Sequence, residues 1–403
     1  MEDLLATPAP ALTGLKVVEF AHVIAGPLAG TLLADLGATV VHVEDPGIGD
    51  PQRQAGPAKD GTHLWWKVAG RNKRSVTLNL RTEAGRDLAR ELAAWADVVI
   101  SNFRVETMEK WGLDFASLIR VNPQLIVLQV SGFGASSSRR NEPGFGKVGE
   151  AMSGVVNITG FPDGPPVHTG FSHGDSVTGL MGAFAIQAAL YRKAHDPDFH
   201  GEWIDLALYE GLFRLIEWQV IFYDQLGVIP ERVGNNLAAA PAAVINTYPT
   251  ADGRWLTVTS GTPRSVSNVA ALVGEPTEEY ATRADQARNS KRLDRLVAKW
   301  VSERTIDECV RIMRQLEVVA SPIYTVADMI SDPTFCERQN IVDVDDPDLG
   351  VVRMQGVVPK LMNHTGSVWR SAPSLGEDNA LVYKQFIGKS DAELTQLAEA
   401  GHI

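Results

Sequence analysis

The first third of the chain alternates between two patterns of hydrophobic and polar residues. The runs from Lys16 to Ala21 and from Ala38 to Glu44 are short, apolar and β-branched, which is typical of buried strands. Between them, small and apolar residues recur at helical spacing in AGPLAGTLLADLG. A strand, a helix and a strand within about 30 residues form a βαβ unit, and such a unit requires a parallel sheet.

The same alternation continues along the chain. The next predicted elements are a strand at Val76–Leu80, a helix over Glu83–Ala96, a strand at Val98–Ile100, a helix over Val105–Arg120 and a strand at Leu125–Val130. Repeated alternation of strands and helices favours a doubly wound α/β domain, with helices on both faces of one sheet.

The second half of the chain has longer helical patterns. One apolar stripe predicts a long helix, with its members at Val177, Leu180, Met181, Phe184, Ala188 and Tyr191. A second helix is predicted over Ile204–Asp224, and a β-hairpin with an Asp-Gly turn over residues 247–259. Charged helical sequence at residues 277–316 indicates a smaller α+β domain, and a last helix is predicted over Asp391–Ala400.

Composition excludes several classes of protein. The chain has 37 Lys and Arg against 49 Asp and Glu, a net charge of -12, so we expect no nucleic-acid partner. Its two cysteines, Cys309 and Cys336, form no C-x-x-C pair, and the histidines are scattered, so we expect no metal. The N-terminus lacks the order of a signal peptide, and no apolar run reaches the ~20 residues of a membrane span. We therefore expect a cytoplasmic protein without a membrane partner.

Asp175 stands at the start of the striped helix, in the segment HGDSVTG. In one interpretation it is a helix N-cap, accepting hydrogen bonds from free backbone N–H groups. In the other, the helix dipole keeps an exposed carboxylate ionised beside small glycines, so that it can attack a thioester carbonyl. The local sequence leaves both interpretations open.

Two further features suggest a ligand site. Arg71, Lys73 and Arg74 precede a predicted strand and Arg81 follows it, so they form either a solvated edge or a phosphate site. His22 follows the first strand, at the carboxyl edge of the sheet, where doubly wound folds bind ligands. Neither a P-loop, nor G-x-G-x-x-G, nor G-x-S-x-G occurs, which argues against nucleoside triphosphates, NAD and serine-hydrolase chemistry.

Four segments in this order resemble the class III CoA-transferases, also called the CaiB/BaiF or formyl-CoA transferase family. They are LTGLKVVEFAHVIAGPLAGTLLADLGATVVHVE, RNKRSVTLNL, NFRVETMEKWGLD and GDSVTG. The resemblance covers nearly the whole chain. It implies a discontinuous Rossmann-like large domain over residues 1–224 and 326–403, a small α+β domain over residues 225–325, and an interlocked dimer.

The resemblance also implies roles for individual residues. Asp175 matches the family's catalytic nucleophile. Residues matching the family's CoA contacts are His22, Val23, Ala25, Lys73, Arg74, Leu78, Arg81, Asn102 and Phe103. Arg104 and Lys110 are nearby cations that we add to this set. No permanently bound cofactor is implied, because the coenzyme A thioester is a co-substrate.

The implied activity is transfer of CoA from a donor thioester, for which we expect succinyl-CoA, to a free organic acid. The route runs through an aspartyl anhydride and an aspartyl-CoA thioester, and requires water to be excluded. Residues 132–146 and 260–262 are the expected covering loops. The expected acceptor is a dicarboxylic or aromatic acid, such as benzylsuccinate, mesaconate, itaconate or citramalate. Ile24 and the segment SGTPRS depart from the oxalate-using enzymes, which disfavours oxalate.

Two alternatives remain open. An α-methylacyl-CoA racemase shares the fold and the aspartate, and its second base is a histidine where this chain has Phe145. Such an isomerase would need another base, for which His168 and His173 are candidates. The other alternative is that this chain is one subunit of a two-chain CoA-transferase, pairing with a related chain rather than with itself.

Overall fold

A computed structural model describes residues 9–237 and 244–403, which form two compact units. The first contains residues 9–153 with Thr169–Leu215 and Pro333–Ile403, and the second contains Gly154–His168 and the described part of Ile216–Asp332. Compactness thus groups residues 154–168 with the second unit. The division into domains at residues 224 and 326 stays a prediction.

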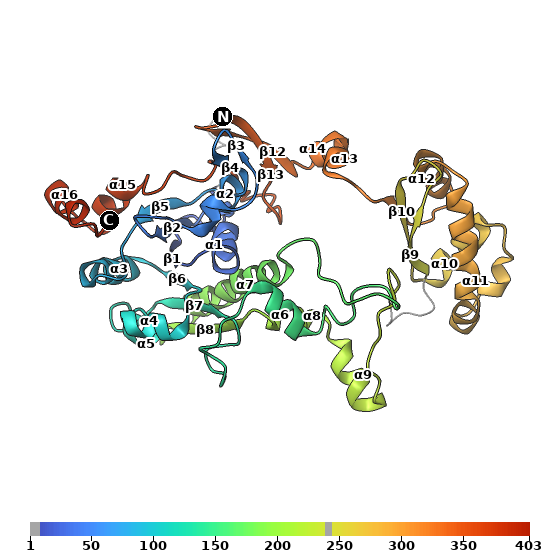
Figure 1. Cartoon of the computed structure of the whole chain (residues 1–403), viewed down its shortest axis with the longest axis horizontal. Coiled ribbons are helices and arrows are strands. Elements are labelled where there is room, and N and C mark those ends of the chain that lie inside the picture. The colour runs from blue at the N-terminus through green and yellow to red at the C-terminus, as the bar shows by residue number, and fades with distance from the viewer. Residues whose placement is uncertain (1–8, 238–243) are drawn as a thin grey trace, which may run out of the picture. The chain divides into compact units, whose positions relative to one another are not determined.

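A parallel sheet is the centre of the first unit (Figure 1). Its strands are β1 (Lys16–Phe20), β2 (Thr39–Glu44), β5 (Arg74–Thr77), β6 (Val98–Ser101), β7 (Ile126–Ser131) and β8 (Glu202–Ala207). They lie in the order β5-β2-β1-β6-β7-β8, and every neighbouring pair is parallel. The expected α/β fold with a parallel sheet is confirmed. The order reverses between β1 and β6, which is where doubly wound sheets bind ligands.

Helices connect these strands and cover both faces. They are α1 (Ala25–Asp35), α2 (Leu64–Ala69), α3 (Glu83–Trp95), α4 (Val105–Trp111), α5 (Phe115–Leu118), α6 (Gly146–Ser153), α7 (His173–His195) and α8 (Glu210–Leu215). One apolar core contains residues of α3 and another contains residues of α1 and α7. The single helix expected over residues 105–120 is divided, because Gly112 adopts a left-handed φ of +63° and Asp114 caps α5.

The helix predicted over Ile204–Asp224 is wrong at its start. Residues up to Ala207 form β8, paired with β7, and the helical sequence that follows is divided into α8 and α9 (Trp218–Leu226). The backbone hydrogen bonds that these residues make to β7 outweigh the local helical pattern, because intrinsic helix propensity is weak compared with the pairing of strands in a sheet.

The face that α7 buries also differs from the prediction. Its buried residues are mostly small: Gly174, Thr178, Gly179, Gly182, Ala183, Ile186 and Ala189. A Cβ on Gly179 would lie 2.8 Å from the Ala25 carbonyl oxygen, so close approach to α1 selects this face. Leu180, Phe184 and Tyr191 of the predicted stripe are exposed in the single chain instead.

The C-terminal segment completes the β5 edge of the sheet. Asp378 accepts hydrogen bonds from Arg74 and from the Ser75 N–H, at 3.0 and 3.1 Å. The buried Tyr383 hydroxyl donates to the Thr77 carbonyl at 2.7 Å. The elements here are α14 (Pro333–Glu337), the hairpin of β12 (Ile341–Asp346) and β13 (Gly350–Gln355), α15 (Asn379–Gln385) and α16 (Asp391–Glu399), which confirms the predicted last helix.

The second unit has its own small antiparallel sheet, β11-β10-β9, and its own apolar core. Strands β9 (Val244–Pro249) and β10 (Trp255–Ser260) form the predicted hairpin, with Gly253 in its turn at a φ of +76°. This unit also contains α9, α10 (Pro263–Leu272), α11 (Arg283–Ser302), α12 (Ile306–Gln315), β11 (Ala320–Pro322) and α13 (Val326–Ser331). Within the described residues, no helix combines the length and hydrophobicity needed to cross a bilayer.

Candidate active site

The turn after β1 lies at the switch point of the sheet. Asn102, which follows β6, accepts a hydrogen bond from the His22 N–H at 2.9 Å and donates one to the His22 carbonyl at 2.7 Å. The His22 ring meets Phe103 edge-on, with ring centroids 4.7 Å apart. Three of the expected CoA-binding residues are therefore brought together where the strand order reverses.

The next residue in this turn, Val23, has a left-handed backbone with a φ of +64°. This conformation is a strained outlier for a β-branched residue. Both carboxylate oxygens of Asp50 accept the Val23 N–H, each at 3.1 Å. Ala25, also expected to contact CoA, begins α1 directly after this turn, with its side chain buried.

The basic cluster is divided between the two edges of the sheet. Arg74 begins β5 and pairs with Asp378, so it lies at the amino edge, opposite the switch-point turn. Arg71 is buried against Asp35 at 2.6 Å. Arg81 follows β5 at the carboxyl edge with 72% of its side chain exposed, pairing with Asp45. Of these arginines, only Arg81 has the position expected of a CoA contact.

Lys73 differs from the expectation of a free phosphate-binding cation. It is 1% exposed, and its ammonium donates to both Glu19 oxygens at 3.0 and 2.9 Å and to the Pro27 carbonyl at 2.6 Å. Its donors are used inside the protein, so Lys73 does not reach a ligand directly in this structure. The Leu78 side chain is also buried, and its N–H donates to the Glu44 carbonyl at 2.7 Å, which leaves only its carbonyl oxygen for any contact.

The two added cations lie on the segment that follows β6. Arg104 is exposed directly before α4, and Lys110 is exposed on α4, where it pairs with Glu106. Both are accessible to an anionic ligand.

Asp175 lies in the first turn of α7, two residues after the helix begins. The N-cap position belongs to Ser172, so the N-cap interpretation of Asp175 is wrong. Because α7 connects two parallel strands, its N-terminus lies at the carboxyl edge of the sheet, and Gly179 one turn later meets Ala25. The carboxylate is therefore at the same edge as the His22 turn.

Glycines make room around the Asp175 carboxylate. A Cβ on Gly146, the first residue of α6, would lie 2.1 Å from Asp175 Oδ2. A Cβ on Gly174 would lie 2.7 Å from the Gly146 carbonyl oxygen. Only glycine at these two positions lets α6 and the start of α7 approach so closely around the acid.

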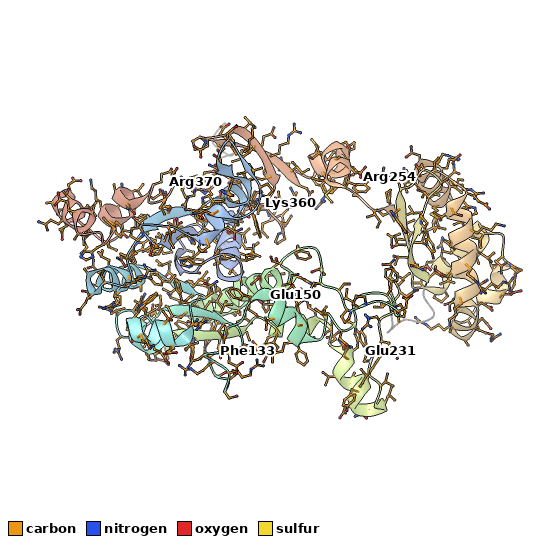
Figure 2. All side chains as sticks on the ribbon, in the orientation of Figure 1. Phe133, Glu150, Glu231, Arg254, Lys360 and Arg370 are labelled. Carbon is orange, nitrogen blue, oxygen red and sulfur yellow. The ribbon has the colours of Figure 1, made fainter. Side chains whose placement is uncertain are left out.

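Glu150 is a candidate site residue that the sequence analysis missed. It projects from α6 (Figure 2), is 1% exposed, and accepts the Gly174 N–H at 3.1 Å and the Lys147 ammonium at 2.9 Å. Lys147 also donates to the Thr169 and Phe171 carbonyls, which ties the segment before α7 to α6. Burial, together with the negative charge of Glu150, raises the pKa of Asp175 to about 6. Asp175 is thus less readily ionised than its place at a helix N-terminus had led us to expect.

Glu150→Gln is expected to shift the pH profile of the enzyme. The substitution removes the negative charge of Glu150 and leaves the positive charge of Lys147 uncompensated, and both changes lower the pKa of Asp175. The acid limb of the kcat/KM profile should therefore move down by roughly one pH unit. The direction follows from the expected role of Asp175: a nucleophile that attacks as a carboxylate loses activity as pH falls through its pKa. The measurement is kcat/KM between about pH 4.5 and 8, with the exposed Glu399→Gln as the matched control. An unmoved limb in Glu150→Gln would show that Glu150 does not set this ionisation.

For the racemase alternative, the structure gives the positions of Phe145 and of the two candidate bases. Phe145 lies directly before α6 with its side chain 77% exposed, and it carries no proton-transferring group. His173 begins α7 with its ring tilted against Phe171, and His168 belongs to the second unit.

Across the described ranges, no group of three or more His, Cys, Asp and Glu residues is placed to hold a metal ion.

The two ends of the loop between β7 and α6 are held by contacts at the base of the loop. Gly132 and Gly144 touch, since a Cβ on Gly132 would lie 2.9 Å from the Gly144 Cα. Asp205 accepts the Ala135 and Ser136 N–H groups at 2.7 and 2.9 Å. Residues 132–146 are thus anchored on both sides at their base. Their closure over a substrate, like that of residues 260–262 in the second unit, stays a prediction.

Comparison with known proteins gives consistent matches. The sequence profile of CoA-transferase family III matches residues 12–379. The chain is 40% identical to succinyl-CoA–D-citramalate CoA-transferase of Chloroflexus aurantiacus, over 97% of each chain. It is 35% identical to the β subunit of succinyl-CoA–L-malate CoA-transferase of the same organism, over 96% of each. A CaiB/BaiF family protein from Brucella suis superposes with a TM-score of 0.81 at 32% identity, over 94% of this chain and 100% of that one.

Proposed function

The chain belongs to CoA-transferase family III, and from this premise we propose that it moves CoA from succinyl-CoA to a free dicarboxylic acid, with Asp175 as the nucleophile. The observation that carries the proposal is the Asp175 carboxylate, set against Gly146 at the carboxyl edge of the sheet beside the switch-point turn. The Chloroflexus relatives that use succinyl-CoA with citramalate or malate support this donor and this class of acceptor.

The proposed reaction has four steps. The Asp175 carboxylate attacks the succinyl thioester carbonyl, and the C–S bond breaks to give a mixed anhydride and CoA thiolate. The thiolate attacks the aspartyl carbonyl, which releases succinate and leaves an aspartyl-CoA thioester. The acceptor carboxylate attacks that thioester, releasing the thiolate again and forming a second anhydride. The thiolate then attacks the acceptor's carbonyl, which frees Asp175 and the new acyl-CoA.

CoA is proposed to bind across the switch point. His22, Val23 and Ala25 would face it from the β1–α1 turn, and Asn102 and Phe103 from the end of β6. The side chains of Arg81, Arg104 and Lys110, and the backbone carbonyl of Leu78, would contact its nucleotide portion. Arg81 is best supported, because it is exposed at the same edge as the turn. Arg74 is the least supported, because it lies at the opposite edge of the sheet.

The experiment that tests the function is a transfer assay. Purified protein is incubated with succinyl-CoA and one free acid at a time, starting with citramalate, malate, mesaconate, itaconate and benzylsuccinate. New acyl-CoA is separated and identified by mass. We expect one or more dicarboxylates to accept CoA with release of free succinate. Exchange of the α-proton of an acyl-CoA, without any acid acceptor, would instead favour the isomerase.

Arg81→Ala should raise the KM for the CoA donor with little change in kcat. One charge-assisted hydrogen bond of about 1.4 kcal/mol corresponds to roughly a ten-fold change, and its proposed position is remote from the reacting carbonyl. Steady-state kinetics with varied succinyl-CoA measure both constants. The exposed Arg120→Ala is the matched control. A fall in kcat at an unchanged KM would contradict the proposed position.

The assembly is proposed to be a dimer in which two chains interlock, or a heteromer with a related chain. The exposed apolar residues Leu180, Phe184 and Tyr191 of α7 support a partner on that face, because monomers rarely expose such a contiguous stripe. The Chloroflexus β subunit supports the heteromeric alternative. Light scattering of the protein alone, and after co-expression with a homologous chain, distinguishes the two.

A further inference from the structure

The strained turn at Val23 is in contact with a chain of buried charges that extends into the sheet through β2 and β1. Asp50, which accepts the Val23 N–H, is fully buried and also accepts the Gln52 N–H at 2.7 Å. The Nε2 atom of His42 lies 3.2 Å from Asp50 Oδ2, an ion-pair contact whose angle is poor for a hydrogen bond. The Asp50 carboxylate therefore links the Val23 N–H to the His42 ring.

On its other side, His42 meets a second carboxylate. Its Nδ1 atom lies 2.8 Å from Glu19 Oε2, and Glu19 is opposite His42 in the register of β1 and β2. Lys73 then donates to Glu19. Glu19 has room only because α1 carries Gly30, where a Cβ would lie 1.5 Å from Glu19 Oε1.

The two carboxylates determine the form of the histidine. A neutral imidazole would present an unprotonated nitrogen to one of two buried carboxylates, and only the imidazolium carries a proton on each nitrogen. Lys73, Glu19, His42 and Asp50 then alternate in sign and balance one another. Burial opposes the charge on His42, but Asp50 and Glu19 outweigh it and raise the pKa of His42 to about 9.

We propose that His42 is a positioning residue for CoA binding, which acts through Asp50 to hold the left-handed Val23 turn in the shape that the acyl-CoA meets. The inference rests on the proposed function, since it takes the β1–α1 turn as part of the CoA site. The strain at Val23 makes the device necessary, because a left-handed valine persists only where its surroundings impose it. Glycine at the same position would tolerate this φ without help.

A double-mutant cycle tests the proposal. Dissociation constants for free CoA are measured by calorimetry for the wild type, His42→Gln, Val23→Gly and the double variant. We expect His42→Gln to weaken CoA binding roughly ten-fold in the valine background, and less than about three-fold in the glycine background. In turnover with succinyl-CoA, His42→Gln should raise KM far more than it lowers kcat. The exposed His364→Gln is the matched control.

Either of two results would overturn the inference: equal losses of affinity in the two backgrounds, or unchanged affinity in His42→Gln. If His42→Gln does not fold, Asp50→Asn takes its place in the cycle with the same expected coupling, because it keeps an acceptor for Val23 but loses the charge that pairs with His42. The readout is binding of CoA itself, so failure of the proposed transfer reaction in the assay above is seen separately.

Discussion

Asp175→Ala is expected to abolish CoA transfer, with kcat reduced by at least about 10³-fold, while binding of free CoA is nearly unchanged. Alanine has no carboxylate to form the anhydride, and none of the proposed CoA contacts involves this side chain. The assay is transfer from succinyl-CoA, together with calorimetry of CoA. Retained turnover would exclude Asp175 as the nucleophile.

The same substitution should raise thermal stability by a few degrees at pH 8. The pKa of Asp175 is about 6 in the folded chain, above the ordinary value of about 3.9 for an unfolded chain. A carboxyl whose folded pKa is raised destabilises the fold once pH exceeds both values. The melting temperature should therefore rise in Asp175→Ala and stay unchanged in Asp198→Ala, which alters an exposed carboxylate after the other end of α7.

Lys73→Met is expected to lower the free energy of unfolding by about 3–5 kcal/mol, because it leaves the buried Glu19 carboxylate without its ammonium partner. Urea denaturation followed by circular dichroism measures the change in midpoint. If Lys73 bound a phosphate of CoA instead, the KM would rise and stability would change little. The exposed Lys59→Met is the control and should unfold like the wild type.

The hydrophobic pattern predicted the central strands of the sheet, because buried strands are continuous apolar runs whereas the helices between them have apolar residues at helical spacing. The βαβ succession from Lys16 to Val130 is present with shifts of a few residues at element ends. The strand β8 was missed because its sequence, EWIDLA, carries two acidic residues and lacks the continuous apolar run of the central strands. The buried face of α7 was also missed, since hydrophobicity does not reveal where two helices approach closely enough to require glycine.

The candidate site, too, could be predicted only in part from the sequence. Asp175 could be predicted from the family resemblance, but Glu150 reads in the sequence as an ordinary acid among glycines, and only the packing of α6 on α7 buries it. The direction of β5 does carry a usable signal for the basic cluster. Residues before a parallel strand lie at its amino edge, so Arg74 belongs to the edge away from the ligand, and Arg81 after the strand belongs to the ligand edge.

The contacts between β5 and Asp378 or Tyr383 have a consequence for how the protein is made. The edge of the first sheet is completed by residues that leave the ribosome some 300 positions later, since Ser75 pairs with Asp378. Until then, the nascent chain exposes a strand edge, which is open to pairing with other chains. We expect early synthesis to be the aggregation-prone stage of this protein, and chaperone demand to fall once the C-terminal helices emerge.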